Sequence, residues 1–145
     1  MATAADPALM TVEQYRQLPD REDVIQELHW GMVVTLTRPK MRHAKLQSRL
    51  ARLLRPMAGQ LGVVETEVAF RALPEYDLRG ADVAHVLRQR WAATEDDDNL
   101  HGSPELVIEV LLPSNTKAEI HEKAVLCLST GALEFWVSGS EAKYR

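Results

Sequence analysis

Two acidic residues interrupt hydrophobic segments of the sequence, and they are its clearest chemical signal. Glu109 lies inside the segment 106–112, Leu-Val-Ile-Glu-Val-Leu-Leu, with aliphatic neighbours on both sides. Asp82 lies at the start of a second apolar segment, Ala-Asp-Val-Ala, at 81–84. A carboxylate buried without a partner costs several kcal/mol. Each acid therefore needs a metal ion, a basic side chain or backbone donors, or an exposed position at the edge of a sheet.

Metal binding is the interpretation that would give the two acids a catalytic function. If the two segments are adjacent strands, both carboxylates meet at one end of a sheet. Hard cations such as Mg²⁺ and Mn²⁺ prefer oxygen ligands and keep bound waters that can react. A buried acid that is simply paired with an arginine, a lysine or backbone N–H groups is the structural alternative.

The elements that would position these acids can be predicted from periodicity and capping signals. The nearly all-apolar segment 106–112 is typical of a central strand covered on both faces. Thr116 and Glu119 form a capping box at the start of a predicted helix over 116–130. The remaining predicted elements are a helix at 12–18, two strands within 25–37, a helix at 41–61, and strands at 63–72, 82–87 and 133–137. This order predicts an α/β fold in which helices flank a mixed sheet.

The predicted helix at 41–61 carries two stripes. Its apolar stripe is expected to face the core and comprises Leu46, Leu50, Leu53, Leu54 and Met57. Its basic stripe is either a solvated face or a set of phosphate contacts, and comprises Arg42, Lys45, Arg49 and Arg52. His43 aligns with the apolar stripe, where it is either a packed core histidine or a side chain that reaches the acids.

Size and composition set the remaining expectations. The chain has 145 residues, 46% of them hydrophobic, which suits one domain at 11–145 after a disordered N-terminus at 1–10. Cys127 is the only cysteine, so no internal disulfide can form, and a cytoplasmic location is expected. No apolar run approaches the roughly 20 residues of a membrane span. The net charge of −4 argues against a generally basic surface.

Several segments in combination resemble the Uma-type restriction endonuclease family, domain of unknown function 820, within the PD-(D/E)-x-K superfamily. The matching segments are Gln26–Val34, Arg79–Val86, Gly102–Ser114, Glu122–Lys123, Leu126–Gly131 and Glu134–Val137. The resemblance runs from about Thr11 to Trp136. It implies a restriction-endonuclease-like core, and the chain stops soon after Val137, as a C-terminally truncated member would.

The resemblance assigns roles to particular residues. It implies that Asp82 and Glu109 are metal ligands and that Glu27 is an auxiliary acid. The superfamily's lysine normally lies two residues after the second acid, where this chain has Leu111. Lys123 is the candidate replacement, although it also lies four residues after Glu119, a spacing typical of a surface ion pair.

These roles imply a Mg²⁺- or Mn²⁺-dependent endonuclease that hydrolyses DNA. Cleavage of both strands often uses two active sites, so a homodimer is compatible with this function. The alternative is a decayed nuclease fold that binds nucleic acid or assembles with proteins. Leu111 and the negative net charge favour this alternative.

Overall fold

A computed structural model describes residues 8–139 of the chain. The helices are α1 (Val12–Arg16), α2 (Met41–Ala58), α3 (Arg88–Ala93) and α4 (Lys117–Ser129). The strands are β1 (Ile25–His29), β2 (Met32–Leu36), β3 (Gly62–Arg71), β4 (Arg79–Leu87), β5 (Leu100–His101), β6 (Leu106–Val110) and β7 (Glu134–Ser138). None of the helices in this described part is long and apolar enough to cross a membrane.

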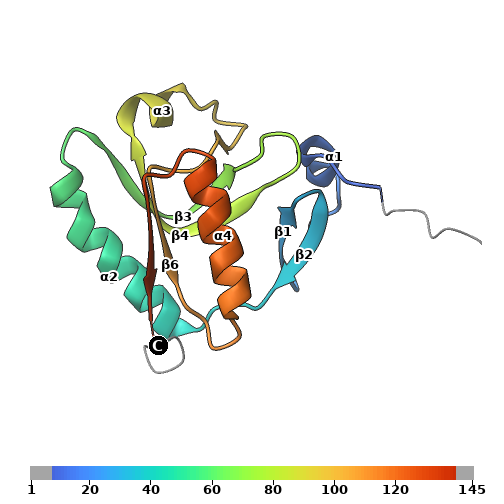
Figure 1. Cartoon of the computed structure of the whole chain (residues 1–145), viewed down its shortest axis with the longest axis horizontal. Helices are drawn as coiled ribbons and strands as arrows, with labels where there is room; N and C mark the ends of the chain where they lie inside the picture. The colour runs from blue at the N-terminus through green and yellow to red at the C-terminus, as the bar shows by residue number, and fades with distance from the viewer. Residues whose placement is uncertain (1–7, 140–145) are drawn as a thin grey trace, which may run out of the picture.

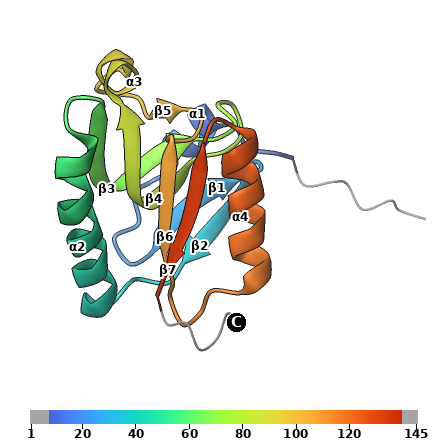
Figure 2. The ribbon, with the colours of Figure 1, turned by 60° about the vertical axis from the view of Figure 1, so that its left-hand side comes forward.

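A five-stranded mixed sheet in the order β5-β3-β4-β6-β7 forms the centre of the molecule. β3, β4 and β6 pair antiparallel, whereas β6 and β7 pair parallel because α4 crosses over between them. Figure 2 shows α2 and α4 on either side of β6 and β7. The predicted mixed sheet flanked by helices is therefore confirmed.

The hairpin of β1 and β2 forms a separate two-stranded sheet beside α4 (Figure 1). Its turn is made by Trp30 and Gly31, which have φ angles of 52° and 80°. The backbone groups of Leu28 and Leu78 exchange hydrogen bonds of 3.0 and 2.8 Å, which join the hairpin to the segment before β4. This junction places β1 next to the start of β4.

Capping fixes the starts of α1 and α4. The side chains of Thr11 and Thr116 each accept the N–H of the residue three positions later, and both capping boxes are complete. Gly131, with a φ of 121°, follows α4 and turns the chain into β7. The helix predicted from Thr116 is confirmed, and the predicted first helix ends earlier, at Arg16.

The predicted core-facing stripe of α2 is wrong in part. The helix buries His43, Gln47 and Ala51 instead, while Leu53 and Met57 are 62% and 80% exposed. The side of α2 that packs on β3 and β4 is therefore rotated from the predicted stripe towards smaller and polar residues, which let the helix lie close to the sheet. Leu46, Leu50 and Leu54 are half-buried at the margin of this contact.

Hydrophobic clusters cover both faces of the sheet. Under α4 lies a cluster that includes Phe70, Val107 and Leu126, and under α2 lies one that includes Val83 and Ile108. The acidic segment 88–102 contains α3 and the short strand β5. The expectation of a disordered 1–10 falls largely on residues outside the described part; Met10 N–H donates to Gly31 O at 2.8 Å.

Candidate active site

Asp82 and Glu109 come together at the contact between β4 and β6. The register that pairs Val83 with Ile108 puts Asp82 directly across from Glu109. Asp82 Oδ2 accepts the backbone N–H of Val110 at 2.7 Å, which fixes the aspartate against the neighbouring strand. Both acids line one cleft of about 780 Å³. The predicted convergence of the two carboxyl groups is therefore what the fold produces.

Lys123 lies in this acid cluster rather than on the surface of α4. Its Nζ forms an ion pair with Glu109 and donates to Gly80 O at 2.6 Å. The Glu119 carboxylate instead accepts the Thr116 N–H, as the capping box requires. Of the two sequence interpretations of Lys123, the structure supports the one that directs it towards the acids.

Glu27 reaches the same cleft from the hairpin. Its Oε2 accepts the backbone N–H of Gly80, and its Oε1 lies 2.8 Å from His29 Nε2. Burial alone would raise the pKa of Glu27, but the contact with His29 and the positive charge of Lys123 hold this pKa below its ordinary value. Glu27 is therefore an ionised carboxylate held at the wall of the cleft.

His43 completes the group from the first turn of α2. Its Nε2 lies 3.3 Å from Asp82 Oδ2, and the residue is 8% exposed. Its buried Nδ1 has no hydrogen-bond partner. His43 is thus both packed against the sheet and in contact with an acid of the cluster, so both sequence interpretations describe part of its environment.

The cluster contains more carboxyl groups than ammonium groups, and this imbalance shifts the pKa values of its members. Burial raises the pKa of Glu109 to about 8; the charge of Lys123 opposes this rise, and Asp82 adds to it. Burial also raises the pKa of Asp82. For Lys123 burial alone would lower the pKa, but Glu109 and Glu27 raise it above its ordinary value. One ammonium group therefore faces three carboxyl groups, and the raised pKa values of Glu109 and Asp82 reflect this surplus of buried acid.

This donor set fits a divalent cation of the Mg²⁺ type. Asp82 and Glu109 are adjacent oxygen donors whose mutual repulsion a cation would relieve. Within residues 8–139, no group of three or more histidine, cysteine or acidic side chains is arranged to hold a metal. Mg²⁺ is commonly held by one or two carboxylates, with waters and substrate phosphates completing its shell. The pair is therefore sufficient for such an ion, whereas a zinc cage would need more ligands.

The basic stripe of α2 lies apart from this cleft. Arg42, Lys45, Arg49 and Arg52 are all exposed, and the cleft lining includes none of the four. His43 is the residue of α2 that does line it. Phosphate contact by the basic stripe stays a prediction.

Two features of the site could not be read from the sequence. Arg79, fully buried, bridges Asp77 and Glu122. Glu67 lines the cleft with a φ of 53°, which is unusual for a residue other than glycine, and the β3–β4 ladder skips it opposite Asp82. The sequence shows Glu122 beside Lys123, but the arginine that pairs with Glu122 lies 43 positions earlier, so local spacing does not reveal the first feature. No local pattern marks the second.

The raised pKa of Glu109 predicts how stability depends on pH. The folded protein binds an extra proton between pH 4.5 and about 8, so the free energy of unfolding should fall as pH rises through this window. Glu109→Gln cannot ionise and should reduce this fall by roughly 1–3 kcal/mol. Urea unfolding of both proteins at pH 5 and pH 8, in metal-free buffer, measures the difference. Equal losses in the two proteins would contradict the assigned proton.

Comparisons with known proteins identify the family of the chain and show its fold. The Uma2 family model, described as "Putative restriction endonuclease", matches residues 12–143. The crystal structure of a putative nuclease belonging to DUF820 from Anabaena variabilis ATCC 29413 is similar to this structure, with a TM-score of 0.71 at 17% sequence identity. The match covers 90% of this chain and 74% of that one, and at this identity it shows a shared fold. A search of curated proteins finds no match.

Proposed function

Because the chain belongs to the Uma2 family of putative restriction endonucleases, we propose that it is a divalent-metal-dependent endonuclease that hydrolyses DNA phosphodiester bonds. The observation that carries this proposal is the convergence of Asp82, Glu109 and Lys123 in one cleft, from three different elements. Acids on adjacent strands and a buried ammonium group are the parts that phosphodiester hydrolysis needs.

The two central acids would hold the cation. Asp82 and Glu109 would hold Mg²⁺ or Mn²⁺, and the ion would supply a lower pKa for a bound water and neutralisation of charge on the phosphate. The Val110 N–H keeps the Asp82 carboxylate in place, and Nε2 of His43 lies beside the same oxygen. The Asp82 carboxylate is therefore held in position by the protein itself, without a bound ion.

Lys123 would supply the fixed positive charge. Its ammonium group is held on one side by Gly80 O and on the other by Glu109. A buried ammonium in this position can hydrogen-bond an attacking water or stabilise the charge that grows on the phosphate oxygens. Glu27, held by Gly80 and His29, would help to orient that water.

The charge of the cleft makes the metal a requirement for substrate binding. Six acids line the cleft: Glu27, Glu67, Asp82, Glu109, Glu119 and Glu122. Lys123 and Arg79 are the lining residues with a permanent positive charge. A phosphate would be repelled by this surplus unless cations offset it, so the cleft itself should bind DNA weakly in metal-free buffer.

Plasmid nicking tests the proposal directly. The purified protein is incubated with supercoiled DNA in Mn²⁺, in Mg²⁺, and in buffer containing a chelator. Nicked or linear DNA should form with the metals and not with the chelator. Absence of cleavage in both metals at micromolar protein, with RNA also left intact, would contradict the endonuclease proposal.

Calorimetric titration with Mn²⁺ separates the enzyme from a decayed nuclease fold. An intact site should give heat of binding, because the two adjacent carboxyl groups are oxygen ligands whose mutual repulsion a bound cation would relieve. No heat, together with DNA or protein binding in metal-free buffer, would favour the binding module. DNA binding through the basic stripe and homodimer formation both stay predictions of the sequence.

A further inference from the structure

Arg79 is an unexpected side chain for the interior. It is 2% exposed and is the largest of the fully buried side chains in the part of the chain described here. A buried guanidinium group is tolerated only when its donors are paired. The partners of Arg79 therefore indicate what it holds together.

The guanidinium group of Arg79 joins β4 to α4. Its Nη1 and Nη2 donate to the two carboxylate oxygens of Glu122 at 2.6 and 2.7 Å, a two-pronged contact. Its Nε donates to the Asp77 carboxylate at 3.0 Å. Asp77 is itself fully buried and also accepts the backbone N–H of Trp30.

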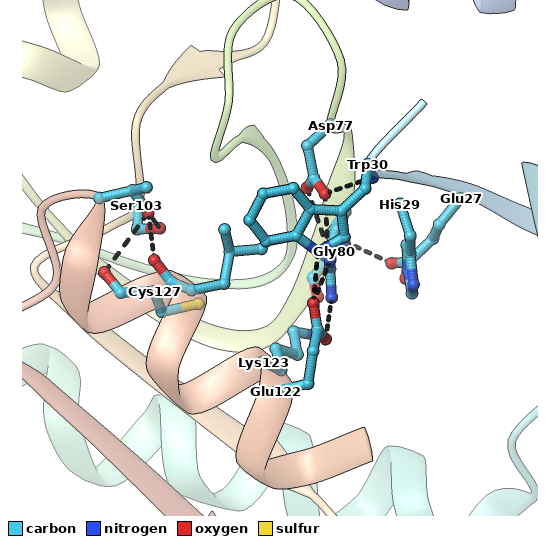
Figure 3. A network of polar contacts seen from close by, with 12 residues as sticks. Glu27, His29, Trp30, Asp77, Gly80, Ser103, Glu122, Lys123 and Cys127 are labelled. Atoms are coloured by element: carbon cyan, nitrogen blue, oxygen red, sulfur yellow. Dashed lines mark hydrogen bonds and ion pairs between the residues drawn. The ribbon is translucent and has the colours of Figure 1, made fainter. Parts of the chain in front are cut away.

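Trp30 closes the network from the tip of the hairpin. Its indole Nε1 donates to Glu122 Oε1 at 2.7 Å (Figure 3). Glu122 is therefore held by both the arginine and the tryptophan. Three separate segments thus meet at one glutamate: the hairpin tip, the start of β4, and α4. Within the described residues, the Trp30–Glu122 contact is the one hydrogen bond that links the hairpin to α4.

The sequence neighbours of this network belong to the active site. Glu122 precedes Lys123 on α4, and Arg79 precedes Gly80 on β4, so the Arg79–Glu122 contact runs alongside the Lys123–Gly80 hydrogen bond. A one-residue slip of α4 would rotate its side chains by about 100° and remove Lys123 from Glu109. Two parallel contacts between the same elements prevent that slip.

We propose, building on the endonuclease function above, that Glu122 and Arg79 are positioning residues that hold the Lys123 ammonium group in the acid cluster. The Glu122 carboxylate is bonded to Arg79 and Trp30 and not to Asp82 or Glu109, so it acts through the helix that carries Lys123. The same contact fixes the hairpin tip, and the hairpin carries Glu27. Loss of Glu122 should therefore loosen Lys123 and leave the central acids in place.

Lysine acetylation followed by mass spectrometry tests this without relying on nuclease activity. In the unmodified protein Lys123 should react slowly, because its side chain is 14% exposed and ion-paired, while Lys117 on the same helix is exposed. Glu122→Gln should raise the acetylation rate of Lys123 roughly tenfold or more relative to Lys117. Glu65→Gln is the matched control, because it removes an exposed arginine–glutamate pair elsewhere.

Two further measurements exclude a merely structural effect. Cys127 is completely buried, so its reaction with a thiol reagent reports global opening and should stay at the wild-type rate. Trp30→Phe, which removes one hydrogen bond from Glu122, should raise the Lys123 rate by less and replaces Glu122→Gln if that variant does not fold. If the protein cleaves DNA, Glu122→Gln should lower kcat and leave KM unchanged.

Unchanged protection of Lys123 in both folded variants would overturn the positioning role. A parallel rise at Lys117 and Cys127 would do the same, because it would show general unfolding. Failure of the endonuclease proposal would appear separately, as intact plasmid with wild-type protein, and would leave the acetylation result standing.

Discussion

Asp82→Asn should lower the rate of metal-dependent DNA cleavage roughly a thousandfold, and Glu109→Gln should do the same. Both changes keep the shape of the side chain and remove a negatively charged oxygen donor from the pair. Each also removes charge from a crowded acid cluster, so neither variant should lose its fold. The expected loss is one of metal binding and not of structure.

Initial nicking rates and calorimetric Mn²⁺ titrations of the same preparations check this result. The heat of Mn²⁺ binding should disappear together with the activity. Glu95→Gln is a suitable control, because it neutralises an exposed acid in the segment between α3 and β5. Cleavage within threefold of wild type in both central variants would show that the reaction uses other residues.

Lys123→Met should lower the cleavage rate roughly a hundredfold to a thousandfold while Mn²⁺ binding is retained. The methionine fills similar space but has no ammonium group to stabilise charge on the phosphate. The metal-binding acids stay in place, and removal of the neighbouring positive charge should strengthen rather than weaken their affinity for a cation. This separates the role of Lys123 from that of the two acids.

Single-turnover cleavage at saturating Mn²⁺ measures the chemical step, and calorimetry measures binding. The measurements need the metal present, because the variant otherwise leaves Glu109 buried beside Asp82 without a cation. Lys117→Met, at an exposed position on the same helix, should cleave at the wild-type rate. Equal rates for Lys123→Met and Lys117→Met would mean that Lys123 has a structural role alone.

The strands and the acid pair could be predicted because their signals are local. The apolar segment around Glu109 indicates a buried strand, and a charge inside it demands a partner. The capping box at Thr116 and the glycine at 131 fix both ends of α4. Antiparallel pairing of β4 with β6 then brings Asp82 to Glu109.

What could not be predicted depends on distant contacts. The spacing of Lys123 from Glu119 permits a surface ion pair, and the fold alone decides that the side chain turns towards Glu109. The leucines of α2 predict a core-facing stripe, but the small Ala51 decides which side lies closest to the sheet. The arginine that holds Glu122 comes from another strand, and no spacing rule connects the two.

Lys123 reaches the acid cluster from α4, whereas Leu111 occupies the place on the strand side that a scan for fixed spacing would inspect. Such a scan would classify the chain as a dead enzyme, although an ammonium group occupies the cluster. A search template built from coordinates, with two carboxylates and one amine and no condition on chain order, would retrieve it. A survey that discards chains for lack of the adjacent lysine would therefore miss this one, in which the amine comes from a helix.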